Sequence, residues 1–479
     1  MLGKKERPKR ELFYLAGSIE DLIPEDHVLK RVNRILSLSW LRDEVKELYC
    51  EDNGRPGIDP ESAVRLMLAG FLLGTVHDRE LMREAQVHLG IRWFAGYRLD
   101  EVLPDHSSLT RIRQRWGEEK FREIFERTVK QCVKAGLVKG DLVHVDATLI
   151  RADVSWESLV ERHVEKVTSE NEDDGGDDGP KGHSAVSSWP KGRTKKVSET
   201  DPDATMATSR KDYRLEPSYK QHTAVDDEKG VIVDVEVTTG EECEGKKLAE
   251  QIERVEKQTG RKVETATADG AYANAGNYLY LERRGTQAII PPQARAGRGK
   301  GLPSTRFRYD AKNGIVKCLR NKTLRASSET AKGVIYRGRA KDCGHCPLRE
   351  KCVPRTGNVR TIAIVRGYEA LQRARRKRQR WDEEDEYIYR RHRWRAEGVH
   401  GEAKERHGMR RAVRRGLWNV AVQAYLAAAA MNLKRLAASF LLILLRLYAS
   451  RNRFQTTDTH TTATRRNSWS LPQEFHRAA

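Results

Sequence analysis

The chain has 479 residues, of which 38% are hydrophobic, and it carries a formal net charge of +20. Its length exceeds what one hydrophobic core organises and predicts about two to four domains, while its hydrophobic content excludes wholesale disorder. The excess positive charge favours polyanionic partners, and nucleic acid is the commonest of these for a soluble protein.

A membrane surface is the rival partner for so basic a chain, but the sequence argues against it. The apolar run FLLILL at 440–445 is too short to cross about 30 Å of hydrocarbon. The segment MLGKKERPKR at 1–10 has neither the apolar region nor the cleavage site of a secretory signal. Seven cysteines is an odd number for a disulfide framework and indicates a reduced compartment. We therefore expect a cytoplasmic protein.

Residues 1–139 predict an all-α domain that binds DNA. HVLKRVNRILSL at 27–38 has apolar residues at helical spacing, and Asp59 followed by Pro60 is a favourable helix start. A third helix, within LPDHSSLTRIRQRWG at 103–117, carries three arginines near its start: Arg111, Arg113 and Arg115. A short capped helix with arginines is typical of DNA recognition, although an ordinary amphipathic helix fits the pattern equally well.

The pattern changes to strands after residue 139. DLVHVDATLIRA at 141–152 is too short and too continuously apolar for an amphipathic helix, and it predicts a strand. The segment 219–240 predicts two strands joined by a turn, the second with alternating valines. Helix and strand patterns then alternate as far as residue 292. We expect residues 140–292 to form the first part of an α/β sheet with crossover connections, interrupted by a polar, flexible segment at 169–212.

Residues 293–360 predict a Cys-rich insertion. Four cysteines lie within it: Cys318, Cys343, Cys346 and Cys352. The Cys-x2-Cys pair with a further cysteine downstream is typical of a knuckle for tetrahedral Zn²⁺, and four thiolates would leave no open position, so the site would be structural. His345 is an alternative ligand. A group of reduced surface thiols remains the plainer interpretation.

Residues 361–437 predict helices that complete the α/β core, and residues 438–479 predict a largely disordered tail. Two basic runs, at 373–380 and 410–416, lie in or near these helices. Phosphate contacts from such runs give affinity without sequence choice, so we expect specificity to come from the N-terminal helices. A solvated linker helix is the alternative interpretation of the first run.

Three acids are candidates for a divalent metal site: Asp146, Asp269 and Glu397. Asp146 lies in the strand segment HVDATL, Asp269 ends a later strand in TADGAY, and Glu397 lies on a helix rich in cations. Hard divalent cations take oxygen ligands, and two ions about 3.5 to 4 Å apart suit in-line displacement at a phosphodiester. Each acid also has a structural interpretation, as a strand cap, a turn residue or an ion-pair partner. Four other acids are alternatives on proximity alone: Asp141, Asp153, Glu402 and Glu405.

The helix around Glu397 has an unusual face. At helical spacing one stripe contains seven residues: Arg393, Glu397, His400, Gly401, Lys404, Gly408 and Arg411. Small residues beside charges indicate a surface that a large anionic molecule approaches closely. Glu402 and Glu405 lie off the line of Arg393, Glu397 and Lys404, and we interpret them as solvated charge balance.

The sequence resembles DDE-type transposases of bacterial insertion sequences, in the group with a Tyr-Arg-Glu-Lys signature. The signature is Tyr-x2-Arg-x3-Glu-x6-Lys, which Arg393, Glu397 and Lys404 match in identity and spacing. Position 390 is arginine, and the nearest tyrosine is Tyr389. HVDATLIRAD resembles the first-aspartate strand of the family, TADGAYANAG its second-aspartate segment, and the upstream helical motifs its N-terminal domain. The resemblance spans about residues 12 to 437.

This resemblance implies a ribonuclease H-like catalytic core in which Asp146, Asp269 and Glu397 bind Mg²⁺ or Mn²⁺. Five basic residues are the expected DNA contacts: Arg393, Lys404, Arg410, Arg411 and Arg111. The implied activity is cleavage at insertion-sequence ends and joining of 3′-hydroxyls to double-stranded target DNA, by a dimer or larger assembly associated with the bacterial nucleoid. A catalytically inactive DNA-binding derivative and a purely hydrolytic nuclease are the alternatives.

Overall fold

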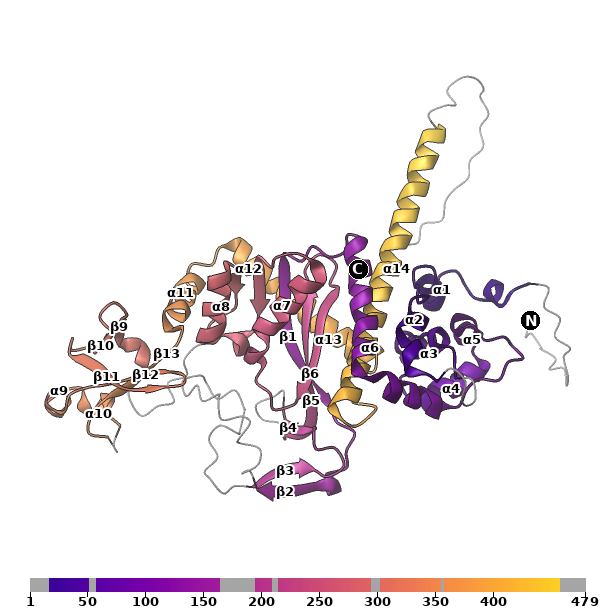
Figure 1. Ribbon diagram of the computed structural model, residues 1–479. Helices are drawn as coiled ribbons and strands as arrows, with labels where there is room; N and C mark the ends of the chain where they lie inside the picture. Colours follow the sequence, from indigo (N-terminus) through magenta and orange to yellow (C-terminus); the bar gives the residue numbers. More distant parts are fainter. Residues whose placement is uncertain are drawn as a thin grey trace, which may run out of the picture.

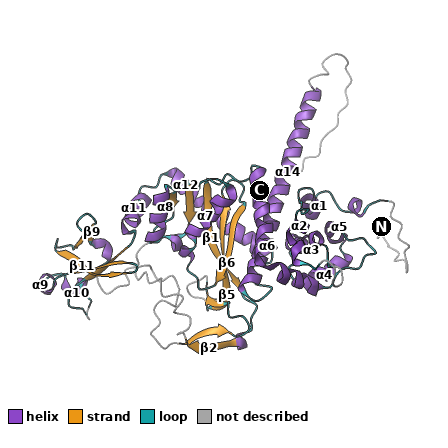
Figure 2. Ribbon diagram, viewed as in Figure 1, coloured by secondary structure: helices purple, strands orange, loops and turns teal. Residues whose placement is uncertain are grey.

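The computed structural model describes residues 17–50, 57–163, 194–208, 214–293, 302–354 and 357–456. The chain is mixed α/β. A central sheet has the N-terminal helices on one side and a smaller β-rich unit on the other (Figure 1). Figure 2 shows that helices also line the sheet itself. Among these residues no helix is long and apolar enough to span a membrane.

The N-terminal part is helical, and a short 3-10 turn at Ile19–Leu22 precedes its helices. The helices of this part are α1 (Val28–Asn33), α2 (Leu41–Val45), α3 (Pro60–Leu73), α4 (Asp78–Val87), α5 (Leu89–Ala95) and α6 (His106–Lys134). The Asp59 side chain accepts a hydrogen bond from the Ser62 amide at 3.0 Å and caps α3, as its place before Pro60 indicates. Gly117, at φ 70°, divides α6 into two arms. One continuous hydrophobic core joins these helices to the central sheet.

The expected α/β sheet with crossover helices is present. Its strands are β1 (Leu142–Arg151), β4 (Thr205–Ala207), β5 (Glu216–Asp226), β6 (Ile232–Thr239), β7 (Thr265–Ala268) and β8 (Gln287–Ile289). β5 pairs antiparallel with β1, β4 and β6, whereas β7 runs parallel to β1 and β8 runs parallel to β7. The crossovers are α7 (Leu248–Thr259) and α8 (Ala275–Arg284). Along the path β6-β5-β1-β7-β8, two parallel strands therefore continue three antiparallel ones, and β4 pairs with the start of β5.

Part of the segment expected to be flexible is ordered. β2 (Leu159–His163) pairs with β3 (Thr194–Ser198), and β4 joins the main sheet. The buried Asp201, between β3 and β4, accepts hydrogen bonds from the Tyr219 hydroxyl at 2.5 and 2.6 Å, which anchors this stretch to β5. The rest of 169–212, at 169–193 and 209–212, lies outside the described residues.

The region of the expected Cys-rich insertion contains a five-stranded antiparallel sheet. Its strands are β9 (Arg308–Asp310), β10 (Ile315–Lys317), β11 (Thr323–Thr330), β12 (Gly333–Arg337) and β13 (Thr361–Val365). They lie side by side in the sheet in the order β13-β12-β11-β10-β9. Two short helices, α9 (Ala340–Gly344) and α10 (Arg349–Cys352), contain Cys343 and Cys352, and Cys346 lies between them. A separate small core supports the sheet, with Val316, Tyr336 and Ile362 among its buried residues.

The C-terminal part is helical. It contains α11 (Tyr368–Arg378), α12 (Glu383–His392), the single π-helical turn η8 (Arg393–Glu397), α13 (Gly398–Arg406) and α14 (Leu417–Thr456). We expected a disordered tail from residue 438, but α14 continues through Thr456, because its buried first half runs on into a leucine-rich sequence of good helix formers. Residues 457–479 lie outside the described part of the chain.

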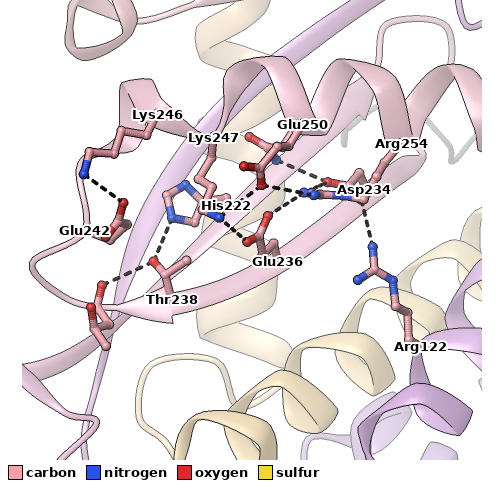
Figure 3. A network of polar contacts seen from close by, with 12 residues as sticks. Arg122, His222, Asp234, Glu236, Thr238, Glu242, Lys246, Lys247, Glu250 and Arg254 are labelled. Carbon is pink, nitrogen blue, oxygen red and sulfur yellow. Dashed lines mark hydrogen bonds and ion pairs between the residues drawn. The ribbon is translucent and has the colours of Figure 1, made fainter. Parts of the chain in front are cut away.

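A network of charges fixes α7 to β6 (Figure 3). Asp234, 3% exposed, accepts two hydrogen bonds from Arg254 at 2.8 and 2.9 Å, and Glu236 accepts a third at 2.6 Å. Lys247, just before α7, is 2.8 Å from Glu236, and Arg122 of α6 is 3.9 Å from Asp234. Buried carboxylates need such partners, since an unpaired buried charge is costly. The network therefore fixes the position of the chain where α7 begins.

Glu402 joins α13 to α14. It accepts hydrogen bonds from Lys434 and Arg435, each at 2.9 Å, and lies 3.5 Å from His407. Burial alone would raise the pKa of Glu402, but His407, Arg435 and Lys434 hold that pKa well below its usual range. The interpretation of Glu402 as solvated charge is therefore wrong. For Glu405 the same interpretation holds. Its side chain is 68% exposed, and its ion-pair partner in the described part of the chain is the surface residue Arg410.

The buried Arg113 has a structural role. Its guanidinium pairs with Asp78, to which Arg414 also binds at 2.6 Å. Arg113 thus ties α6 to α4 and to the chain after α13, and it is not presented to DNA. Arg111, on the same arm of α6, is exposed.

Replacing Glu402 should destabilise the protein, whereas the same change at Glu405 should not. Glu402→Gln removes the charge shared by Lys434 and Arg435, and we expect a loss of about 2 kcal/mol in the free energy of unfolding. Glu405→Gln should change it by less than about 0.5 kcal/mol. Urea unfolding of both variants at neutral pH measures this, and equal losses would contradict the assignment.

Candidate catalytic centre

Asp146 and Asp269 lie side by side because β1 and β7 are parallel neighbours. Val145 pairs with Ala268, and an aspartate follows each of them. Asp146 remains within β1, whereas Asp269 follows β7 and caps the 3-10 turn η6 (Gly270–Tyr272) by accepting a hydrogen bond from the Ala271 amide at 2.9 Å. Folding therefore joins two of the three acids that the sequence singles out.

The electrostatics of the two aspartates differ. The pKa of Asp269 is raised to about 6, first by burial and then by the negative charges of Glu244 and Asp146. Burial would also raise the pKa of Asp146, but His400 and His392 lower it below its usual value. His400 Nδ1 lies 3.4 Å from Asp146 Oδ2. Repulsion between neighbouring carboxylates is what a bound cation relieves, so this donor set fits a divalent metal.

Glu397 lies on the helix that packs against β1, but its carboxylate faces solvent. The turn η8 contacts β1, and the residues that face the sheet are Ala396, Val399 and His400. Glu397 is 61% exposed and pairs with Arg393 at 3.2 Å. Among the described residues, no three His, Cys, Asp or Glu side chains are arranged to hold one metal ion. The structure thus joins Asp146 and Asp269 and leaves Glu397 apart from them.

Tyr389 is within electrostatic range of both Asp269 and Glu397. Its pKa is raised by burial and by the charges of both acids, against the effect of Arg378, and its ring stacks on His392 at a centroid distance of 6.2 Å. The family signature places tyrosine one residue later. A π-helical turn contains one residue more than an α-helical turn, so η8 offsets this difference and keeps Tyr389 on the face of Glu397.

Four of the expected DNA contacts follow one path at the surface. Lys404 Nζ donates to Thr148 Oγ1 at 2.6 Å, two residues beyond Asp146 on β1. The chain at Arg410 and Arg411 runs beside Arg151, the last residue of β1, and both side chains are exposed. Arg393 is 83% exposed near Glu397. Arg111 lies on α6, away from this strand.

The acids weighed as alternatives have other positions. Asp141 is exposed just before β1, and Asp153, beyond its far end, pairs with Arg411 at 2.9 Å. Neither is among the charges that act on Asp269.

The sequence analysis missed a chain of buried polar groups beneath the site. Thr267 Oγ1 is 2.6 Å from His144 Nδ1 and 2.9 Å from His392 Nδ1. Burial lowers the pKa of His392 to about 4, so its imidazole is neutral at physiological pH. Alternation in β1 was the available signal, because His144 must share a face with Asp146. Glu244 and the buried Tyr272 were also missed, and no local pattern marks either of them.

Three cysteines of the β-rich unit, Cys318, Cys343 and Cys346, lie in electrostatic range of the fourth, Cys352, but among the described residues these side chains are not arranged to hold a metal ion. The pKa of Cys352 is raised by burial and by the charges of Cys343, Cys346 and Cys318, against the effect of Arg360. The Lys322 amide donates to Cys318 Sγ at 3.3 Å. All four are free thiols, and zinc stays a prediction.

Two segments of the chain match known families. Residues 17–115 match "Transposase domain (DUF772)", and residues 317–437 match "Transposase DDE domain". The second match contains Glu397 and the four cysteines, whereas Asp146 and Asp269 lie between the two matches. No curated protein matches the chain.

Three solved structures are similar at low identity. They are a piggyBac transposase synaptic complex with hairpin DNA (10% identity, 88% of this chain and 74% of that chain, TM-score 0.33), a pre-cleavage Mos1 transpososome (12%, 53% and 66%, 0.17) and the Mos1 strand transfer complex (12%, 75% and 83%, 0.17). TM-scores of this size do not establish a shared fold. The two family matches show that the chain carries a transposase domain and a transposase DDE domain, and they support a DDE-type transposase.

Proposed function

We propose that this chain is a DDE-type transposase with the Tyr-Arg-Glu-Lys signature, which cuts DNA at insertion-sequence ends and joins the freed 3′-hydroxyls to target DNA. The observation that carries the proposal is the adjacency of Asp146 and Asp269 on parallel strands, in a chain with two transposase domain matches. Three antiparallel strands continued by two parallel ones support a ribonuclease H-like core.

In this proposal Asp146, Asp269 and Glu397 hold Mg²⁺ or Mn²⁺. When bound, the ions would supply activation of water or of a 3′-hydroxyl and stabilisation of the leaving oxygen. The protein contributes two aspartates fixed by strand pairing and a hydrogen bond from the Ala147 amide to Asp146 at 2.8 Å. Lys404 lies in range of Asp146, where its ammonium would hold a phosphate of the DNA backbone.

The proposed partner is double-stranded DNA, as terminal repeats and as target. Arg393, Lys404, Arg410 and Arg411 would bind its backbone along β1, and Arg111 would contribute from the N-terminal helices. Because two ends must be brought together, we propose a dimer or larger assembly during the reaction. Its location would be the bacterial nucleoid.

We also propose that Cys318, Cys343, Cys346 and Cys352 hold a structural Zn²⁺. The support is the electrostatic range of the other three cysteines to Cys352 and the amide hydrogen bond to Cys318 Sγ, since main-chain donors commonly stabilise bound thiolates. The two turns that carry these residues would then be joined by the metal.

Replacing Asp146 should abolish cleavage without abolishing DNA binding. Asp146→Asn keeps the shape of the side chain and removes the charge that a divalent cation requires. Cleavage and strand transfer of DNA with the element's own ends, in Mg²⁺, should fall below detection, while DNA binding by gel shift persists. Asp141→Asn, five residues upstream at an exposed position, is the matched control and should remain active. Full cleavage by Asp146→Asn would overturn the proposal.

Purified protein should contain about one equivalent of zinc, as a single four-thiolate site requires. Metal analysis by mass spectrometry measures it directly. Cys346→Ser should lose the zinc, and Cys50→Ser, which changes an exposed cysteine of the N-terminal part, should keep it. Zinc-free protein with all four cysteines reduced would contradict the site.

A further inference from the structure

The β-rich unit carries much of the positive charge of the chain. Residues 302–366 contain sixteen Lys or Arg residues and four Asp or Glu residues, so this stretch carries +12 of the net charge of +20. The unit lies at the end of the molecule opposite the N-terminal helices (Figure 1). The basic residues that the proposed function assigns to DNA all lie outside this stretch, so its charge has no role so far.

One face of the five-stranded sheet packs on the small core of the unit. Val316 and Leu324, on neighbouring strands, are 0% and 3% exposed. Cys352 of α10 also packs against this core, and Gly338, which leads into α9, lies close to both Cys343 Sγ and the Leu324 side chain. The two short helices are therefore placed on the core side of the sheet.

The opposite, open face of the sheet carries four cations, one on each of four neighbouring strands. Arg308 of β9 is paired with Lys317 of β10, and Arg325 of β11 is paired with Arg337 of β12. Successive side chains of a strand point to opposite faces, so these four residues, each next in sequence to a core residue, face away from the core. The three arginines are exposed, and Lys317 is half-buried.

The strand pairing places like charges directly opposite each other twice on this face. Directly opposed cross-strand residues have Cβ atoms about 4.5 to 5.5 Å apart, and like charges in such pairs destabilise a sheet. In the described part of the unit the ion pair is that of Lys322 with Asp342, and none of the four cations has an acidic partner. Asp310, which shares the face, accepts a hydrogen bond from the Asn313 side chain at 2.9 Å. The open face thus opposes folding, which indicates a role in binding.

The shape and chemistry of the open face fit duplex DNA. Neighbouring strands lie about 4.8 Å apart, so cations on four successive strands form a row about 14 Å long. One phosphate cannot contact the whole row, whereas double-stranded DNA has one negative charge per about 1.7 Å of its axis. Single-stranded nucleic acid is typically bound by exposed aromatic side chains, and the aromatic residues of this sheet, Phe307, Tyr309 and Tyr336, belong to its core or pack against it.

We propose that the open face of the β-rich unit, with Arg308, Lys317, Arg325 and Arg337, binds the phosphate backbone of double-stranded DNA without reading its sequence. It is a second DNA-binding surface besides the one along β1. The inference rests on the proposed function for the choice of DNA as the partner. Bound phosphates would relieve the repulsion within the two like-charged pairs, because each would lie between cations that have no other counter-charge.

Binding of the full-length protein to a short duplex of arbitrary sequence, followed by fluorescence anisotropy over a range of salt concentrations, tests the proposal. The double variant Arg325→Gln/Arg337→Gln should bind about tenfold more weakly at about 0.1 M salt, and its plot of log K against log salt should be shallower by about 1.8, as the loss of two phosphate contacts requires. Arg325→Lys/Arg337→Lys keeps the charge and should lose less affinity. The matched control is Lys341→Gln/Lys351→Gln, which removes the same charge from exposed residues of α9 and α10 and should bind as the wild type does.

A thermal melt without DNA separates binding from folding. Because the two arginines repel each other, Arg325→Gln/Arg337→Gln should melt at the wild-type temperature or above it. Unchanged DNA binding by this variant, or equal losses in it and in the control, would overturn the inference and leave the proposed function intact. A greater loss for single-stranded DNA than for the duplex would also overturn it. Failure of the wild type to bind any duplex would instead contradict the proposed function itself.

Discussion

The parallel pairing of β1 with β7 is the constraint on which the candidate centre depends. Neighbouring carboxylates repel one another, and although His400 and His392 offset the cost at Asp146, the raised pKa of Asp269 shows that its charged form is disfavoured in this position. The buried Val143, Val145, Ala266 and Ala268 of the paired strands supply the opposing apolar stabilisation. The core of the protein therefore holds together two charges that would separate if either strand shifted. This stored repulsion also favours the binding of a cation.

The N-terminal helices and the helix of Glu397 belong to the same packed unit. His407, at the end of α13, donates to the Phe71 carbonyl of α3 at 2.6 Å. Gly408 has φ +67°, and a Cβ there would lie 2.6 Å from Val76, so the chain after α13 contacts the N-terminal part closely at a residue that must be glycine. Asp78 adds a buried ion pair across the same boundary. A displacement of these helices on binding DNA would consequently act on α13 and, through it, on the surface beside β1.

The sequence predicts features that depend on neighbouring residues, but it does not predict features that depend on a partner far away along the chain. The hydrophobic pattern predicts a strand that contains Asp146 and another that ends just before Asp269, and Asp59 marks a helix start through its own capping bond. Glu402 looked solvated because its partners, Lys434 and Arg435, lie on another helix. Glu244 escaped notice because only the contact between the 3-10 turn at Glu244–Lys246 and η6 brings its charge near Asp269. The strands of the β-rich unit are three to eight residues long, so glycine and charge obscured their alternation.

The separation of Glu397 from the aspartates has a physical explanation within the proposed function. An ion pair as exposed as Glu397–Arg393 contributes little to stability, so breaking it costs little. A DNA phosphate is a strong, bidentate partner for arginine, and it would take Arg393 from Glu397. Tyr389 is in electrostatic range of both Glu397 and Asp269, so the two acids share a neighbour. Because DNA would supply the charge that frees the third acid, binding of the substrate itself would complete the metal site.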